Sequence, residues 1–143
     1  MSEATEQTQA TEPTPTPYDL LGGEAGVRRL AESFYRVMDA SPEAAGIRAM
    51  HGADLAPITQ YLFEWLSGWL GGPALYIQRK GTPCLTAPHR AFKIGDAERD
   101  QWMFCMRGAL DQTEIGPELR ALLERAFGQV ASMLRNQPSD AGN

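Results

Sequence analysis

The stretch WLSGWLGGPALYIQRKGTPCLTAPHRAFKIGDAERDQWMFCM, residues 65–106, decides how this chain folds. Helical periodicity lies on both sides of it, but its middle, residues 71–95, has neither helical nor strand periodicity. Glycines and prolines punctuate this middle part, as is typical of a loop: they are Gly71, Gly72, Gly81, Gly95, Pro73, Pro83 and Pro88. Large apolar side chains that need burial argue against disorder: they are Leu75, Tyr76, Ile77, Leu85, Phe92 and Ile94. An ordered irregular segment of this length is usually functional, so we predict that it walls a ligand pocket with His89 pointing into it.

The flanking sequence predicts helices. Apolar positions recur at helical spacing from Glu24 to Met38, over residues 55–69 and from Trp102 to Leu110. Ser41-Pro42-Glu43 predicts the start of a short helix that ends near His51, and Pro117 predicts the start of the last helix. In that helix we expect these side chains to face inward: Leu119, Leu122, Leu123, Ala126, Phe127, Val130 and Leu134. No segment has a convincing strand pattern, so the fold class is all-α.

Length and composition indicate one folded domain with polar ends. The chain has 143 residues, enough for one domain with a real core. Residues 1–17 are Thr/Pro-rich and predict a disordered arm, residues 18–136 the folded domain, and residues 137–143 a flexible tail. The first residues lack the basic start and apolar run of a signal peptide, and no apolar run approaches transmembrane length.

Charge and cysteine content exclude several classes of function. Without Glu3, Glu6, Glu12 and Asp140 of the terminal segments, the 18 acidic residues fall to 14 against 13 basic ones, so the folded part is nearly neutral. There is no basic stripe for nucleic acid and no strongly basic face for a membrane. Cys84 and Cys105 lack CxxC spacing, which argues against a zinc site or a disulfide framework and leaves them as small apolar fillers in a protein of the reducing cytoplasm.

His89 is the candidate ligand of a metal. A lone loop histidine is more often hydrogen-bonded to the backbone, but Pro88 and apolar neighbours make the surroundings of His89 stiff and dry. No second histidine, cysteine or carboxylate lies at a spacing that would complete a zinc or iron set. A single neutral imidazole is sufficient for haem, because the porphyrin supplies four further nitrogens.

Three motifs resemble a truncated haemoglobin of the second group. They are SGWLGGPALY at residues 67–76, G-x-P-x-L-x-x-x-H-x-x-F-x-I at residues 81–94, and ERDQWMFCM at residues 98–106; the resemblance covers roughly Tyr18 to Gln137. It implies a shortened globin, with helices stacked two over two around haem b, and His89 as the proximal iron ligand. It also implies that Tyr35 and Trp102 donate hydrogen bonds to a ligand on the distal side, although core packing would explain either residue alone.

The same resemblance places His51 beside the distal ligand. The family position holds phenylalanine, tyrosine or histidine, and a polar residue there would add a third donor. The alternative is a helix-end histidine that faces the negative end of its own helix. A further variant has Tyr35 or His51 binding iron itself when no ligand is present.

Further cofactor contacts follow from the resemblance. The residues expected to line the haem are mostly apolar: Ile58, Leu62, Trp65, Leu66, Phe92 and Ile94. Tyr76 and Lys80 match positions that reach the haem propionates. Pro88 stands where the family commonly has an arginine, a contact for which Arg79 and Arg90 are the candidate replacements.

These expectations lead to one preferred function and two alternatives. The preferred one is binding of dioxygen at iron held by His89, followed by redox chemistry with nitric oxide or peroxide, supported by an unidentified reductase. Carbon monoxide is a further expected ligand, and the chain is expected to be a monomer or a homodimer. The alternatives are a non-catalytic haem-based oxygen binder or sensor acting through a partner, and a helical interaction module that has lost haem.

Overall fold

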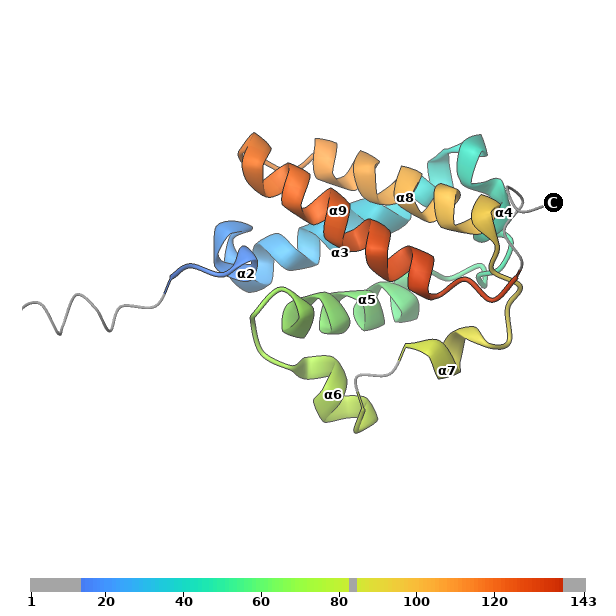
Figure 1. The fold of residues 1–143 in the computed structure, drawn as a ribbon, viewed down its shortest axis with the longest axis horizontal. Helices are drawn as coiled ribbons and strands as arrows, with labels where there is room; N and C mark the ends of the chain where they lie inside the picture. Colours follow the sequence, from blue (N-terminus) through green and yellow to red (C-terminus); the bar gives the residue numbers. More distant parts are fainter. Residues whose placement is uncertain (1–13, 83–84, 138–143) are drawn as a thin grey trace, which may run out of the picture.

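The structure, a computed structural model, describes residues 14–82 and 85–137. Within them every regular element is a helix, which confirms the all-α prediction for that part of the chain. In order, the elements are α2 (Pro17–Leu20), α3 (Gly23–Ala40), the 3-10 helix η1 (Pro42–Ala44), α4 (Ala45–Arg48), α5 (Ala56–Trp69), α6 (Leu75–Lys80), α7 (Thr86–His89), α8 (Asp96–Asp111) and α9 (Pro117–Met133) (Figure 1). None of these helices is long and apolar enough to cross a bilayer.

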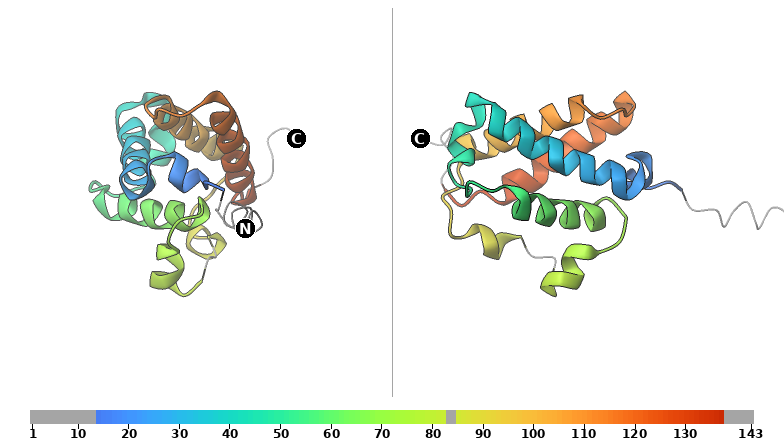
Figure 2. Two further views of the ribbon diagram at one scale, coloured as in Figure 1. Left: turned by 90° about the vertical axis from the view of Figure 1, so that its left-hand side faces the viewer. Right: turned by 180° about the vertical axis from the view of Figure 1, so that it is seen from behind.

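Four long helices form the core in two pairs. Helix α3 packs against α5 and against α8, and α9 packs against α8, so that one pair, α3 and α5, lies against the other, α8 and α9 (Figures 1 and 2). Their largest fully buried side chains are Phe34, Phe127, Leu30, Met38, Leu66 and Met106. Leu122 departs from the predicted inward face of α9, because it is 47% exposed while the neighbouring Leu123 is buried.

The folded part begins before the predicted boundary at residue 18. The Thr16 hydroxyl accepts a hydrogen bond from the Asp19 amide at 3.2 Å, and the Asp19 carboxylate accepts one from the Thr16 amide at 3.1 Å. This reciprocal cap opens α2. Tyr18 then packs on the turn after α5, where its amide donates to the Leu70 carbonyl at 3.0 Å and its ring leaves no room for a side chain at Gly72. The predictions for residues 1–13 and 138–143 lie outside the described residues.

The segment predicted to be irregular contains two short helices. Helix α6 has six residues and α7 has four, which is too short for a periodicity that is measured over 11 or more residues. The prediction of a structureless segment is therefore wrong in part. Ile77 and Phe92, which we expected to be buried, are 44% and 42% exposed. The views of Figures 1 and 2 place α6 and α7 on one side of α5, away from the α8–α9 pair.

Candidate functional site

His89 is the last residue of α7 and is half-buried. Its Nδ1 lies 2.5 Å from the carbonyl oxygen of Leu85, four residues earlier. Because a carbonyl can only accept, Nδ1 carries the proton and donates it, which leaves the lone pair of Nε2 available in the neutral ring. This is the state in which an imidazole binds a metal, with its other nitrogen fixed by a backbone carbonyl.

His89 has no companion ligands for a bare metal ion. Among residues 14–82 and 85–137, no group of three or more histidine, cysteine or acidic side chains could hold one. Within this described part of the chain, a free His89 nitrogen therefore suits a cofactor that brings its own metal ligands.

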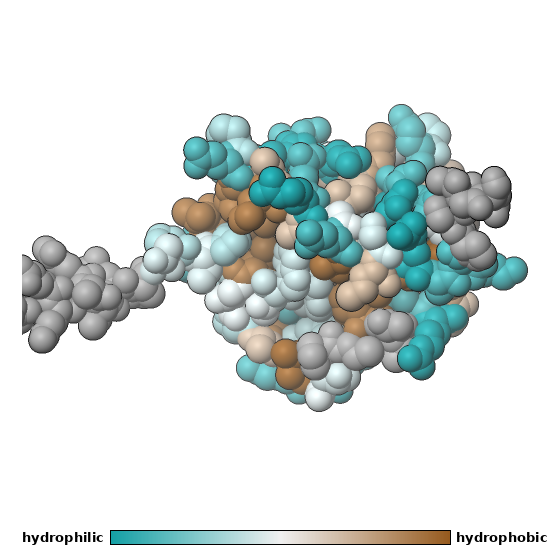
Figure 3. All heavy atoms as spheres, viewed as in Figure 1, coloured by the Kyte–Doolittle hydropathy of each residue, from teal (hydrophilic) through white to brown (hydrophobic). Residues whose placement is uncertain are grey.

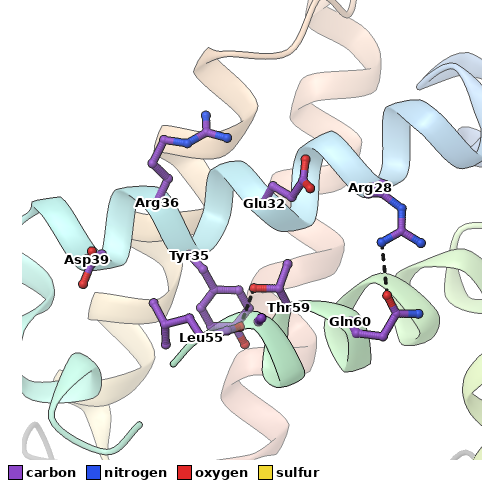
Figure 4. A pocket seen from close by; sticks show the side chains of 9 residues that line it. Arg28, Glu32, Tyr35, Arg36, Asp39, Leu55, Thr59 and Gln60 are labelled. Carbon is purple, nitrogen blue, oxygen red and sulfur yellow. Dashed lines mark hydrogen bonds between the residues drawn. The ribbon is translucent and has the colours of Figure 1, made fainter. Parts of the chain in front are cut away.

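Tyr35 extends from α3 toward the start of α5 (Figure 4). It is 7% exposed, and its hydroxyl has no hydrogen-bond partner among the described residues. The neighbouring Thr59 hydroxyl donates instead to the Leu55 carbonyl at 2.7 Å. Burial, with a smaller contribution from the charge of Cys105, raises the pKa of the Tyr35 phenol well above its usual value. Tyr35 is therefore a neutral, unused O–H donor across the physiological pH range.

A groove of about 490 Å³ opens beside Tyr35, between α3 and α5. Its rim is charged, and Arg28 donates across it to the Gln60 side-chain carbonyl at 3.1 Å (Figure 4). The residues that line it are Arg28, Glu32, Tyr35, Arg36, Asp39, Leu55, Ala56, Thr59 and Gln60. Tyr35 is thus the side chain that separates this groove from the core.

Trp102 of α8 and Tyr35 of α3 both contact the ring of Phe34. The Phe34 ring lies 4.9 Å from Tyr35 and 5.1 Å from Trp102, measured between ring centroids. The indole N–H of Trp102 has no hydrogen-bond partner within the described part of the chain. The fold therefore brings together the two predicted donors, which are separated by 67 positions in the sequence.

His51 lies beside Tyr35, with the two ring centroids 5.7 Å apart. Its Nδ1 lies 2.7 Å from the Ile47 carbonyl and must donate to it, so Nε2 of the neutral ring is an acceptor. His51 thus lies next to Tyr35, and its role as a third donor to a distal ligand stays a prediction. Gln101 of α8 helps to fix the position of Ile47, because its side-chain oxygen accepts a hydrogen bond from the Ile47 amide at 2.9 Å.

One face of α5 carries apolar side chains that the protein covers only in part. Ile58, Leu62 and Trp65 lie one turn apart and are half-buried, and Trp65 stacks on Trp69 with a centroid distance of 5.1 Å. Apolar surface is visible where α5 and α9 lie in Figure 3. Such a stripe on a single domain is typical of a surface that binds an apolar partner. Leu66 is completely buried, so it belongs to the core rather than to the predicted contact face.

Helix α6 is anchored by an ion pair that sequence reasoning missed. Glu64 of α5 is buried, and Arg79 donates to its two carboxylate oxygens at 2.6 and 2.5 Å while Gln60 donates at 2.9 Å. The hydrogen bonds from Arg79 lower the pKa of Glu64 against the opposing effect of burial. A single acid in the apolar run YLFEWL was the available signal. This pairing occupies Nε and Nη2 of Arg79, and the replacement of the missing propionate contact by Arg79 or Arg90 stays a prediction.

The other predicted residues of this wall divide between core and surface. Tyr76 is buried, whereas the Lys80 ammonium lies 4.4 Å from the centroid of the Tyr61 ring on α5. After His89, Phe92 is exposed and Ile94 is half-buried. Cys105 is completely buried, as predicted, while Cys84 lies outside the described residues.

These features fit a haem. His89 offers one free imidazole nitrogen, α5 offers a half-covered apolar stripe, and Tyr35 and Trp102 offer two donors without protein partners. A flat apolar group with a metal at its centre uses all three, whereas a polar substrate would leave the stripe uncovered.

Known proteins have similar sequences and the same helical architecture. The family model described as "Bacterial-like globin" matches residues 16–136. The group 2 truncated hemoglobin YjbI of Bacillus subtilis (strain 168) is 30% identical over 120 residues, which cover 84% of this chain and 86% of that protein. The cold-adapted truncated hemoglobin of the Antarctic bacterium Pseudoalteromonas haloplanktis TAC125 is 45% identical, with a TM-score of 0.84 over 87% of this chain and all of that one. The group II 2-on-2 hemoglobin of Agrobacterium tumefaciens is 40% identical, with a TM-score of 0.84 over 90% and 99%.

Proposed function

Because this chain belongs to the bacterial-like globin family, as a group II truncated haemoglobin with the two-over-two fold, we propose that His89 holds the iron of a haem b at which dioxygen binds. Family membership supports haem-based oxygen binding, and the finer assignment rests on this chain's own residues. The single observation that carries it is the hydrogen bond from His89 Nδ1 to the Leu85 carbonyl, which leaves Nε2 free for iron. Non-covalent haem b fits because no CxxCH motif is present to attach the porphyrin.

A haem held by His89 would supply an iron that binds dioxygen and other diatomic ligands. Tyr35 and Trp102 then act on the bound ligand. Both groups keep their proton, and both lie in a site of low polarity, where a hydrogen bond to a partly charged acceptor is strong. His51 packs against Tyr35, with ring centroids 5.7 Å apart, and so limits the positions that the phenol can take.

Two strong donors favour redox chemistry over transport. A protein that releases dioxygen slowly is a poor carrier but keeps it in place for a second reactant. Dioxygen, nitric oxide and one electron together give nitrate, so turnover requires an electron donor such as a reductase. Activation of peroxide is the other reaction that fits the same donors. Repeated turnover of nitric oxide by the purified protein with a chemical reductant distinguishes the first reaction from a non-catalytic oxygen binder, and consumption of peroxide distinguishes the second.

Absorption spectra of the wild type, His89→Ala and His51→Ala test the proposal. The two histidines are a matched pair, since each is half-buried and each donates from Nδ1 to the carbonyl four residues earlier. We expect an intense Soret band that shifts with carbon monoxide in the wild type and in His51→Ala, and its loss or replacement by a different coordination spectrum in His89→Ala. Loss of the band in His51→Ala with a normal spectrum in His89→Ala would reverse the assignment. A wild type that stays colourless with added hemin would refute haem binding.

A further inference from the structure

The chain after α9 returns to the segment that follows His89, and Asn136 makes the contact. Its amide donates to the Ile94 carbonyl at 2.7 Å, and its side-chain oxygen accepts from the Ile94 amide at 2.8 Å. Asn136 therefore pairs with both backbone groups of Ile94, as a neighbouring β-strand would, with its side-chain carbonyl in place of a backbone one.

The other end of the same side chain reaches back toward His89. The Asn136 Nδ2 group donates to the Phe92 carbonyl at 2.8 Å and lies 3.5 Å from the carbonyl of His89 itself. The His89 carbonyl also accepts from the Phe92 amide at 3.1 Å. The side chain of Asn136 therefore both accepts a hydrogen bond from, and donates to, the backbone of one loop, the six residues 89–94.

Among the described residues, this loop has few other contacts that hold it. Helix α7 has only four residues, and a single turn of helix is not stable without tertiary contacts. Within the described parts of the chain, α7 makes no extensive backbone packing with another helix. On its N-terminal side His89 is fixed by the Leu85 carbonyl; on its C-terminal side Asn136 supplies the side-chain hydrogen bonds to the loop, beside the Phe92 amide bond to His89 and the Gln137 amide bond to Ile94 at 3.2 Å.

Arg135, the residue before Asn136, fixes the chain at this point. Arg135 donates to the Asp96 carboxylate at 2.7 Å, at the start of α8, and to the Ser132 carbonyl at 3.1 Å. Residues 135 and 136 are therefore tied to the helix that carries Trp102 before they reach the loop.

We infer that Asn136 is a positioning residue for His89, and that its side chain restricts the orientations in which the imidazole meets the iron. The inference rests on the proposed role of His89 as the iron ligand. Asn136 does not touch the cofactor in this account; it acts through the backbone of the loop. A loose loop would let the ring adopt several orientations, so the strength of the iron–imidazole bond would vary among molecules.

Resonance Raman spectra of the ferrous protein, together with the rate of haem loss to an excess of an apoglobin acceptor, test this. The variants are Asn136→Ala, which removes both side-chain functions, and Asn136→Asp, which keeps the size and the acceptor but loses the donor to the Phe92 and His89 carbonyls. The matched control is Arg120→Ala, which removes a surface link between α9 and the end of α8, made to Asp111 at 2.7 Å and far from His89 in the sequence.

We expect the iron–histidine stretching band to broaden in both Asn136 variants and to stay narrow in Arg120→Ala. Haem loss should be about 3- to 10-fold faster in Asn136→Ala, as the removal of one or two exposed hydrogen bonds from a holding loop predicts. A band as narrow as that of the wild type in both Asn136 variants would overturn the inference, even if thermal stability fell. Absence of the band in the wild type would instead refute the role of His89 as the ligand.

Discussion

The hydroxyl of Tyr35 and the indole N–H of Trp102 are predicted to control how long dioxygen stays bound. Tyr35→Phe removes only the hydroxyl, and Trp102→Phe removes the indole N–H with part of the ring system while keeping an aromatic ring against Phe34. A hydrogen bond to a charged group contributes about 1.5–3 kcal/mol, and each 1.36 kcal/mol changes a rate tenfold, so one bond corresponds to a change of roughly 10- to 150-fold. Tyr35 is almost completely buried, so the loss of its hydroxyl should change the rate by an amount in the upper part of that range. Trp102 is half-buried, so the loss of its N–H should have an effect near the lower end.

The stability of the two variants should not follow their oxygen kinetics. The Tyr35 hydroxyl has no protein partner among the described residues and borders the groove, so its removal breaks no hydrogen bond within the protein. The free energy of unfolding of the apoprotein should therefore stay the same or rise by up to about 1 kcal/mol in Tyr35→Phe. A destabilised Tyr35→Phe protein would mean that the hydroxyl has a structural bond, contrary to this account.

Stopped-flow measurement of dioxygen dissociation from the ferrous protein, with carbon monoxide as the trap, gives the rates. The double variant shows whether the two donors act independently, in which case their effects multiply. Tyr18→Phe is the control, since Tyr18 packs near Gly72 at the far end of α5. Because burial raises the pKa of Tyr35, slow release should persist without change up to about pH 9. Release from Tyr35→Phe at the wild-type rate would refute the proposed role of this residue.

Three further predictions concern stability and reactivity. Glu64→Gln should lower the free energy of unfolding at neutral pH, and this loss should shrink in acid. The pKa of Glu64 is lower in the folded than in the unfolded state, so the stability that its carboxylate contributes is present above the unfolded pKa and disappears as the pH falls through the folded pKa. A difference in urea unfolding that does not change with pH would contradict this. Gly26→Ala places a Cβ 1.7 Å from a backbone carbonyl oxygen and should cost about 1–3 kcal/mol or more, whereas Gly128→Ala meets nothing within 4 Å and should be tolerated, as thermal melts would show. Burial raises the pKa of Cys105 to about 11, so in a Cys84→Ser background the native protein should react with thiol reagents at pH 8 only as fast as it unfolds.

The long helices could be predicted from the sequence because their signals are local. The apolar spacing from Glu24 and the prolines at positions 42 and 117 depend only on neighbouring residues, and the corresponding elements begin within one residue of those positions. Spacing alone indicated no more than a helical bundle. The motifs around His89 were needed to predict the two-over-two arrangement, which the related structures confirm.

The details that the sequence did not reveal depend on partners far along the chain. Glu64 is buried only because Arg79, 15 residues later, supplies two hydrogen bonds, and α6 is too short to show a period. The acceptor state of His51 follows from the position of one carbonyl, that of Ile47. Leu66 and Leu62 are both apolar residues of α5, and only the packing of α3 and α8 decides that the first is enclosed and the second is not.

The cluster of aromatic rings in the core also makes the intrinsic fluorescence of the protein sensitive to haem binding. Trp69 stacks on Phe127 at 4.8 Å and on Trp65 at 5.1 Å, and Phe127 lies 5.9 Å from Trp102, so all three tryptophans of the chain belong to one group of touching rings. Two of these indoles, Trp65 and Trp69, belong to α5, and Trp102 of α8 is joined to them through Phe127. Light absorbed by any of them would pass to a bound porphyrin by energy transfer, which depends steeply on separation. Intrinsic fluorescence should be bright in the empty protein and almost dark in the loaded one, so that haem uptake and loss can be followed in real time without a label.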